Sequence, residues 1–224
     1  MKRTLYDPSV RDVVRIPING KMLIGDLAVP SEPKGLVVFA HGSSSSRLSP
    51  RNNYVGEILN HRHLATLLFD LLSEDEDQKI ANRFNIELLS SRVLKAIEWI
   101  SRYELVSGLD IGLFGASTGA AAAMLAAVTL DSPVKAIVSR GGRVDMAYPI
   151  IGRIKVPTLL IVGQNDSGVR EINEEAFLKL SCHKELAEIP NASHLFEEPH
   201  ALERVAELAA SWFDKYLGGS DVHV

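Results

Sequence analysis

Ser117 lies at the centre of Gly115-Ala116-Ser117-Thr118-Gly119, a G-x-S-x-G pattern. A short, mostly apolar run (110–114) precedes the pattern, and a run of small and apolar residues (120–130) follows it. This order predicts a buried strand, a sharp turn and a helix, with the serine at the apex as a nucleophile. Glycine is needed on both sides because a side chain there would collide across the strained turn. The alternative is a helix start that Ser117 or Thr118 merely caps.

A serine nucleophile needs a neutral imidazole to take its proton and a carboxylate to orient that imidazole. On a parallel sheet with this strand–serine–helix turn, the acid and then the histidine follow the serine along the chain. Asp166 follows the penultimate predicted strand (158–162), and His194 follows the last one (185–189). We therefore expect His194 to be the base and Asp166 its partner, although Asp166 beside Asn165 could also be a turn former.

Other residues compete for these two roles. Asp145 follows an earlier predicted strand, so its loop lies one strand further from His194. His183 precedes the last strand and His200 begins the final helix, so neither lies in the loop that opens beside Ser117. Asp145 remains the alternative to Asp166, and His183 and His200 remain the alternatives to His194.

A second apolar run, 36–40, leads directly into His41-Gly42-Ser43. In this arrangement the loop after that strand supplies one backbone N–H to the oxyanion of the reaction, and the residue after the nucleophile supplies the other. We assign these N–H groups to Ser43 and Thr118, with Ser44 as the substitute for Ser43.

Two arginines are placed to meet a substrate. Arg47 lies in the loop after strand 36–40 (the oxyanion loop), and Arg140 ends the predicted strand that follows the helix at 120–130 (the elbow helix). Arginine pairs well with a carboxylate or a phosphate, but it also braces loops through structural ion pairs.

The segment 140–156 is too short for an inserted cap domain. An uncapped site is open and shallow, which favours small or short-chain acyl groups.

The rest of the chain must position these residues. A hairpin is expected over 13–29, turning at Asn19-Gly20, and strands alternate with helices from residue 35 onward. The expected strands are 36–40, 65–71, 111–114, 136–139, 158–162 and 185–189, and the expected helices are 53–60, 84–103, 120–130, 171–180 and 201–217. This pattern predicts one α/β domain over 1–224, with a mostly parallel sheet of about eight strands and helices on both faces. Residues 218–224 are expected to be a frayed tail, and Glu74 to Asp77 a solvated acidic loop.

The composition fits an ordinary globular enzyme. The chain has 224 residues, 46% of them hydrophobic and 23% charged, and a net charge of −4. That charge argues against a nucleic-acid or anionic-membrane partner. Cys182 is the single cysteine, and neither a signal peptide nor a membrane span is apparent, so we expect a cytoplasmic protein. We expect no metal and no organic cofactor, and the oligomeric state is left open, a homodimer included.

Several motifs together resemble the α/β-hydrolase superfamily, and within it the dienelactone hydrolase-like group of small members without a lid. The resemblance covers nearly the whole chain. It is carried by FAHGSSSSRLSPRN at 39–52, GLFGASTGAAAA at 112–123, SRGGR at 139–143, LLIVGQND at 159–166 and SHLFEEP at 193–199. It implies the α/β-hydrolase fold and a triad of Ser117, Asp166 and His194.

One departure from that group bears on the substrate. The namesake dienelactone hydrolases carry a cysteine nucleophile where this chain has Ser117. Ordinary ester hydrolysis is therefore favoured over dienelactone, and we expect a serine carboxylesterase for a small-molecule ester with a short acyl chain. The alternatives are lactone or thioester hydrolysis, or acyl transfer, on the same triad. A ligand-binding or regulatory protein with negligible turnover is the alternative of another class.

Overall fold

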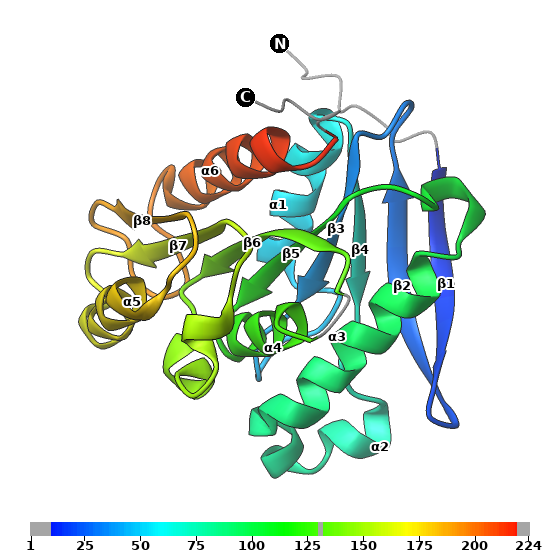
Figure 1. Ribbon diagram of the computed structural model, residues 1–224, viewed down its shortest axis with the longest axis horizontal. Coiled ribbons are helices and arrows are strands. Elements are labelled where there is room, and N and C mark those ends of the chain that lie inside the picture. Colours follow the sequence, from blue (N-terminus) through cyan, green and yellow to red (C-terminus); the bar gives the residue numbers. More distant parts are fainter. Residues whose placement is uncertain (1–9, 130–131, 219–224) are drawn as a thin grey trace.

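An eight-stranded sheet forms the centre of the computed structural model, which describes residues 10–129 and 132–218. The strand order is β1-β2-β4-β3-β5-β6-β7-β8 (Figure 1). The strands are β1 (Val10–Ile18), β2 (Lys21–Val29), β3 (Gly35–Ala40), β4 (Leu64–Phe69), β5 (Ile111–Ala116), β6 (Val134–Arg140), β7 (Thr158–Gly163) and β8 (Lys184–Ile189). Leu130 of the expected elbow helix and residues 219–224 of the expected tail lie outside the described residues.

The sheet has an antiparallel edge and a parallel body. β1 and β2 form the expected hairpin, whose turn residues Asn19 and Gly20 both have positive φ (50° and 76°). Asn-Gly is favoured there because a two-residue hairpin turn needs left-handed conformations. β2 also pairs antiparallel with β4, and every later pairing is parallel. The prediction of a mostly parallel sheet of about eight strands is confirmed.

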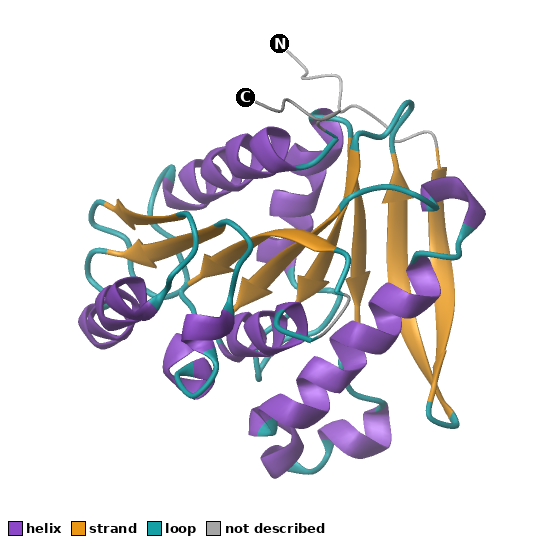
Figure 2. Cartoon of the chain, in the orientation of Figure 1, coloured by secondary structure: helices purple, strands orange, loops and turns teal. Residues whose placement is uncertain are grey.

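Helices cover both faces of this sheet (Figure 2). One face packs against α1 (Pro50–His61) and α6 (Ala201–Tyr216). The other packs against α3 (Ile86–Ile100), α4 (Thr118–Ala127) and α5 (Ser167–Lys179). Strands β3, β4, β5 and β7 are buried at every position, which explains their continuous apolar sequences.

The acidic run is a short helix, α2 (Glu74–Asp77), and the expectation of a solvated loop is wrong. The cause is a buried arginine on α3. Arg92 donates from Nη2 to the Glu76 carboxylate at 2.6 Å, and Glu76 also accepts the Ser73 N–H at 3.0 Å. A buried guanidinium needs a counter-charge, which the turn at 74–77 delivers. The helix expected over 84–103 is likewise shorter, because Asn85 caps α3 by accepting the Leu88 N–H.

The segment 140–156 contains two 3₁₀ turns, Val144–Ala147 and Ile151–Arg153, and no cap domain. The carboxyl edge of the sheet is therefore left uncovered by any inserted unit, as expected. Among the described residues, no helix is both long enough and apolar enough to cross a membrane.

Candidate active site

The predicted site residues meet at one edge of the sheet. β3, β5, β6, β7 and β8 run parallel, so their carboxyl ends lie side by side. Ser43 follows β3, Ser117 follows β5, Arg140 ends β6, Asp166 follows β7 and His194 follows β8. Residues distant in the sequence are thus gathered by the strand order alone.

Ser117 occupies a strained turn between β5 and α4. Its backbone has φ 52° and ψ −122°, which a residue with a side chain rarely adopts. Two backbone hydrogen bonds hold it there: the Ser117 N–H donates to the Arg140 carbonyl at 3.1 Å, and the Arg143 N–H donates to the Ser117 carbonyl at 3.0 Å. The Ser117 side chain makes no capping hydrogen bond to α4, so the geometry disfavours the role of helix cap.

The two glycines of the motif have separate steric reasons. A Cβ on Gly115 would collide with the α4 backbone at Ala120. A Cβ on Gly119 would collide with the carbonyl oxygen of Ala40, at the end of β3. The glycines therefore let the elbow helix lie directly against β5 and β3, which places Ser117 beside the oxyanion loop.

His194 and Asp166 form a short hydrogen bond. The distance between His194 Nδ1 and Asp166 Oδ2 is 2.6 Å. Because an ionised carboxylate only accepts, Nδ1 carries the proton, and Nε2 of the neutral ring is left as an acceptor. The His194 imidazole is 39% exposed and the Asp166 carboxylate 16% exposed, so the imidazole is the more accessible of the two groups.

The loops after β7 and β8 are tied together, which fixes this pair. The Asn165 N–H donates to the Ala192 carbonyl at 2.9 Å, and Asn165 Nδ2 donates to the Asn191 carbonyl at 2.9 Å. The Asn191 N–H donates in return to Gln164 Oε1 at 3.0 Å. Asn165 thus holds the neighbouring Asp166 loop against the histidine loop.

Ser117 and His194 line one pocket of about 210 Å³. The other lining residues are Gly42, Ser43, Ser44, Ser45, Arg51, Ala116, Arg140 and Leu195. Within the described residues the Ser117 hydroxyl makes no hydrogen bond. Catalytic hydrogen bonds are commonly long in unliganded sites and shorten when substrate binds.

Two backbone N–H groups close to Ser117 have no hydrogen-bond partner among the described residues. Thr118 is the first residue of α4, and Ser43 follows the tight approach of Gly42, where an added Cβ would lie 3.1 Å from Ser117 Cβ. In the part of the chain that the structure describes, neither the Ser43 nor the Thr118 N–H donates a hydrogen bond. Free donors at a helix N-terminus and in an adjacent loop suit a developing oxyanion. Ser44 lines the same pocket.

The competing residues have other contacts. Asp145 accepts two hydrogen bonds from Arg143, at 2.9 and 2.8 Å, and these bonds lower the pKa of the Asp145 carboxyl. His183 stacks on Trp212 with ring centroids 5.7 Å apart, and His200 is exposed at the start of α6. None of the three candidates is among the residues that line the pocket of Ser117.

The two predicted substrate arginines differ in their surroundings. Arg47 pairs with Asp26 of β2 at 3.0 Å and with Asp70 after β4 at 3.2 Å. Its backbone N–H also donates to Asp70 at 2.9 Å, so Arg47 braces the oxyanion loop against two strands. Arg140 instead lines the pocket beside Ser117.

His41 has a role that the sequence reasoning missed. Its Nε2 accepts the Leu71 N–H at 3.0 Å, so Nδ1 carries the proton and donates to the Gly42 carbonyl at 2.9 Å. Burial lowers the pKa of His41, which keeps the ring neutral and able to accept. The position of His41 between a buried strand and Gly42 was the available signal for this loop-fixing role.

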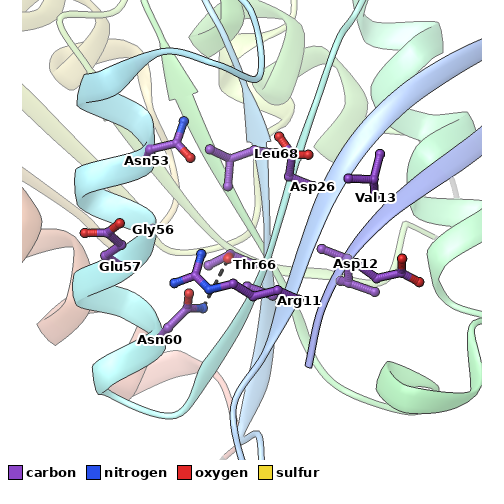
Figure 3. A pocket seen from close by; sticks show the side chains of 12 residues that line it. Arg11, Asp12, Val13, Asp26, Asn53, Gly56, Glu57, Asn60, Thr66 and Leu68 are labelled. Carbon is purple, nitrogen blue, oxygen red and sulfur yellow. Dashed lines mark hydrogen bonds between the residues drawn. The ribbon is translucent and has the colours of Figure 1, made fainter. Parts of the chain in front are cut away.

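A second hollow, of about 240 Å³, lies between α1 and strands β1, β2 and β4 (Figure 3). Asn60 Nδ2 donates to Thr66 Oγ1 at 3.1 Å on its floor, and Asp26 at its rim pairs with Arg47. None of the predicted catalytic residues lines it. The residue types that support nucleophilic chemistry therefore converge in the pocket of Ser117.

Comparison with known proteins identifies relatives of two kinds. A dienelactone hydrolase from Anabaena variabilis is 47% identical, with a TM-score of 0.89, and the match covers 93% of this chain and 98% of that one. Two proteins of Mycobacterium tuberculosis, each named a putative phosphoribosyl transferase, are 48% identical over 214 residues, or 95% of this chain. The chain spans about half the length (48%) of these curated relatives.

More distant structures share the fold. Est1E from Butyrivibrio proteoclasticus is 18% identical with a TM-score of 0.75, over 90% of this chain and 99% of that one. No family model matches the sequence. Because the Anabaena protein is nearly half identical over almost the full length of both chains, and the eight-stranded α/β-hydrolase sheet is shared, the chain belongs to the dienelactone hydrolase family.

Proposed function

We propose that the chain is a serine hydrolase that cleaves esters of small or short-chain acids. One observation carries the proposal: the 2.6 Å hydrogen bond from His194 to Asp166 leaves Nε2 free in the pocket that also holds the strained Ser117. Hydrolases and esterases among the structural neighbours support the same reaction type.

The reaction then runs in two halves. His194 Nε2 takes the proton of Ser117 Oγ as that oxygen attacks the ester carbonyl, and the N–H groups of Ser43 and Thr118 hold the oxyanion. The bond to the alcohol breaks, and His194 gives the proton to the departing alcohol. A water molecule, deprotonated by His194, attacks the acyl-enzyme, releases the acid and restores Ser117. Asp166 holds the imidazole and stabilises its charged form throughout.

A lactone is the second candidate substrate. The Anabaena relative is named a dienelactone hydrolase, and the identity of 47% favours a cyclic ester for this chain as well. The same attack opens the ring, with the alcohol remaining on the acyl group. The name phosphoribosyl transferase belongs to proteins about twice as long, so it does not say which half carries that activity.

A fluorophosphonate label read by intact mass tests the nucleophile, followed by turnover of acetyl to butyryl chromogenic esters. Wild type and the surface control Ser107→Ala should each gain one adduct. Ser117→Ala should gain none and lose about a million-fold in turnover. A labelled Ser117→Ala, or one that keeps a tenth of the activity, overturns the assignment. An unlabelled and inactive wild type indicates a binding protein on this fold.

A further inference from the structure

Asn173 is a fully buried asparagine on α5, outside the Ser117 pocket. Its Nδ2 donates to the Gly142 carbonyl at 2.9 Å and to the Val169 carbonyl, one turn earlier on α5, at 2.8 Å. Both partners are carbonyl oxygens, which only accept, so the amide nitrogen must be the atom that faces them. Its Oδ1 is buried without a hydrogen-bond partner among the described residues. A polar side chain that is unfavourable in a helix and half satisfied when buried indicates a role beyond packing.

The carbonyl that Asn173 holds belongs to the same peptide unit as the Arg143 N–H. That N–H donates to the Ser117 carbonyl at 3.0 Å. A trans peptide unit is planar and points its C=O and its N–H in opposite directions, so Asn173 lies on one side of it and the nucleophile on the other. Asn173, this peptide unit and Ser117 therefore form a chain of hydrogen bonds in which each bond polarises and orients the next.

The loop after β6 needs such a contact because its own backbone is permissive. Gly141 has φ 53° and Gly142 follows it, and glycine adopts more conformations than any other residue. A side chain at 142 is excluded, since an added Cβ would collide with Ser139 Oγ. In the described part of the chain no backbone N–H donates to the Gly142 carbonyl. The orientation of the peptide unit must therefore be fixed from outside the loop, and Asn173 is the side chain that reaches it.

The same contact connects the nucleophile to the acid of the predicted triad. Asp166 is the N-cap residue of α5, so the helix that carries Asn173 begins directly after the acid. A second bond holds α5 to the segment after β6, because the Tyr148 hydroxyl donates to the Ile172 carbonyl at 2.8 Å. The helix that starts at Asp166 is thus fastened to the loop that supports Ser117.

We propose that Asn173 is a positioning residue, which fixes Ser117 relative to His194 by orienting the Gly142–Arg143 peptide unit. Its effect on turnover rests on the proposed function, whereas its hold on the loop does not. Because Asn173 does not line the pocket, it acts on the geometry of attack and not on substrate binding. A displacement of the reacting atoms by about 1 Å is enough to lower turnover about 100-fold.

The first arm of the test measures kcat and KM separately for a butyryl chromogenic ester. Asn173→Leu, which removes the donor, should lower kcat about 10- to 100-fold and change KM by less than about threefold. The matched control is Asn60→Leu. Asn60 is also buried, and its Nδ2 donates to the Leu64 carbonyl at 2.9 Å, but it lies near the end of α1 and outside the Ser117 pocket. Both variants should unfold at a lower temperature than the wild type, and only Asn173→Leu should lose kcat.

The second arm measures backbone hydrogen exchange by mass spectrometry, which does not depend on activity. The amides of Ser117 and Arg143 should exchange faster in Asn173→Leu than in the wild type, because the peptide unit that links them is released. In Asn60→Leu these two amides should exchange as in the wild type. This arm stays readable even if Ser117 is not the nucleophile.

A selective loss of kcat together with faster exchange supports the proposal. An unchanged kcat with faster exchange overturns it, because Asn173 would then support the fold alone. Unchanged exchange also overturns it, as does an equal loss of kcat in both variants. If Asn173→Leu does not fold, Asn173→Ala removes the same donor with a residue that favours the helix, and it takes the same two arms. A wild type that hydrolyses no ester refutes the esterase assignment, and the exchange arm then decides the loop contact by itself.

Discussion

Replacement of Asp166 by asparagine tests the link between the acid and the base. The substituted amide keeps the size of the side chain but changes what it presents to His194. The carboxylate only accepts, so it fixes the proton on Nδ1 at 2.6 Å. An amide NH₂ group donates, which favours the tautomer with the proton on Nε2, where it blocks attack by Ser117.

Two estimates of the transition-state stabilisation that Asp166→Asn loses are similar in size. In a serine protease triad, the corresponding change lowers kcat about ten-thousand-fold, which is about 5.5 kcal/mol of transition-state stabilisation. Alternatively, the attraction between an imidazolium and a carboxylate at the observed 2.6 Å is about 6 kcal/mol for an effective dielectric constant of about 20. The second value is an upper limit, because the imidazole is 39% exposed and water screens the pair.

The assay is kcat/KM for a butyryl chromogenic ester, measured for Asp166→Asn and for the matched control Asp145→Asn. The control breaks a partly exposed ion pair with Arg143, at 2.8 Å, and should cost about 1 kcal/mol of stability with turnover nearly unchanged. Circular dichroism melting confirms that both variants fold. If Asp145→Asn is the crippled enzyme and Asp166→Asn is nearly normal, the acid has been assigned to the wrong strand. If neither variant is impaired, neither carboxylate is the partner on which the base depends.

Two further expectations concern pH and chain length. Because burial lowers the pKa of His41, this side chain takes up a proton at a higher pH in the unfolded chain than in the folded one. The free energy of unfolding should therefore be highest above the ordinary histidine pKa of about 6.5 and fall as the pH drops below that value. Urea unfolding at several pH values should show that this acid loss is smaller in His41→Asn, and an equal loss in both proteins would contradict it. Acetyl to butyryl esters should have a higher kcat/KM than dodecanoyl esters. Each methylene of the acyl chain contributes about 0.8 kcal/mol of binding only where an apolar groove buries it. Serines and arginines are prominent among the residues that line this pocket. A steady rise in kcat/KM up to long chains would indicate such a groove.

The sequence predicted what depends on short-range pattern and on strand order. The hairpin turn at Asn19-Gly20 and the strand–serine–helix turn at Ser117 follow from local backbone demands. The contact of Asp166 with His194 follows from strand order, because adjacent parallel strands end side by side. The catalytic roles of these residues remain predictions that the variants above must test.

What the sequence missed depends on partners that are distant along the chain. The helix at Glu74–Asp77 forms around Arg92, which no local pattern identifies as buried. Arg47 is held by ion pairs with Asp26 on β2 and with Asp70 directly after β4, and no pattern in the sequence around Arg47 indicates these partners. Ion pairs of this kind are set by tertiary packing. The sequence alone therefore does not show whether a run of charged residues or an arginine in a loop is exposed to solvent, forms a structural ion pair or binds a substrate.

The loop after β6 contacts Ser117 and His194, which lie in separate motifs of the sequence. The Arg140 carbonyl and the Arg143 N–H hold the strained Ser117 backbone from both sides. Gly141, at φ 53°, brings the same loop so near His194 that an added Cβ would lie 3.4 Å from its ring. The side chain of Arg140 then faces the pocket that these two residues share. The residues around Gly141 therefore hold the Ser117 backbone, lie against the His194 ring and carry the Arg140 charge. A change of backbone conformation at Gly141 should disturb all three, whereas Arg140→Met removes only the charge.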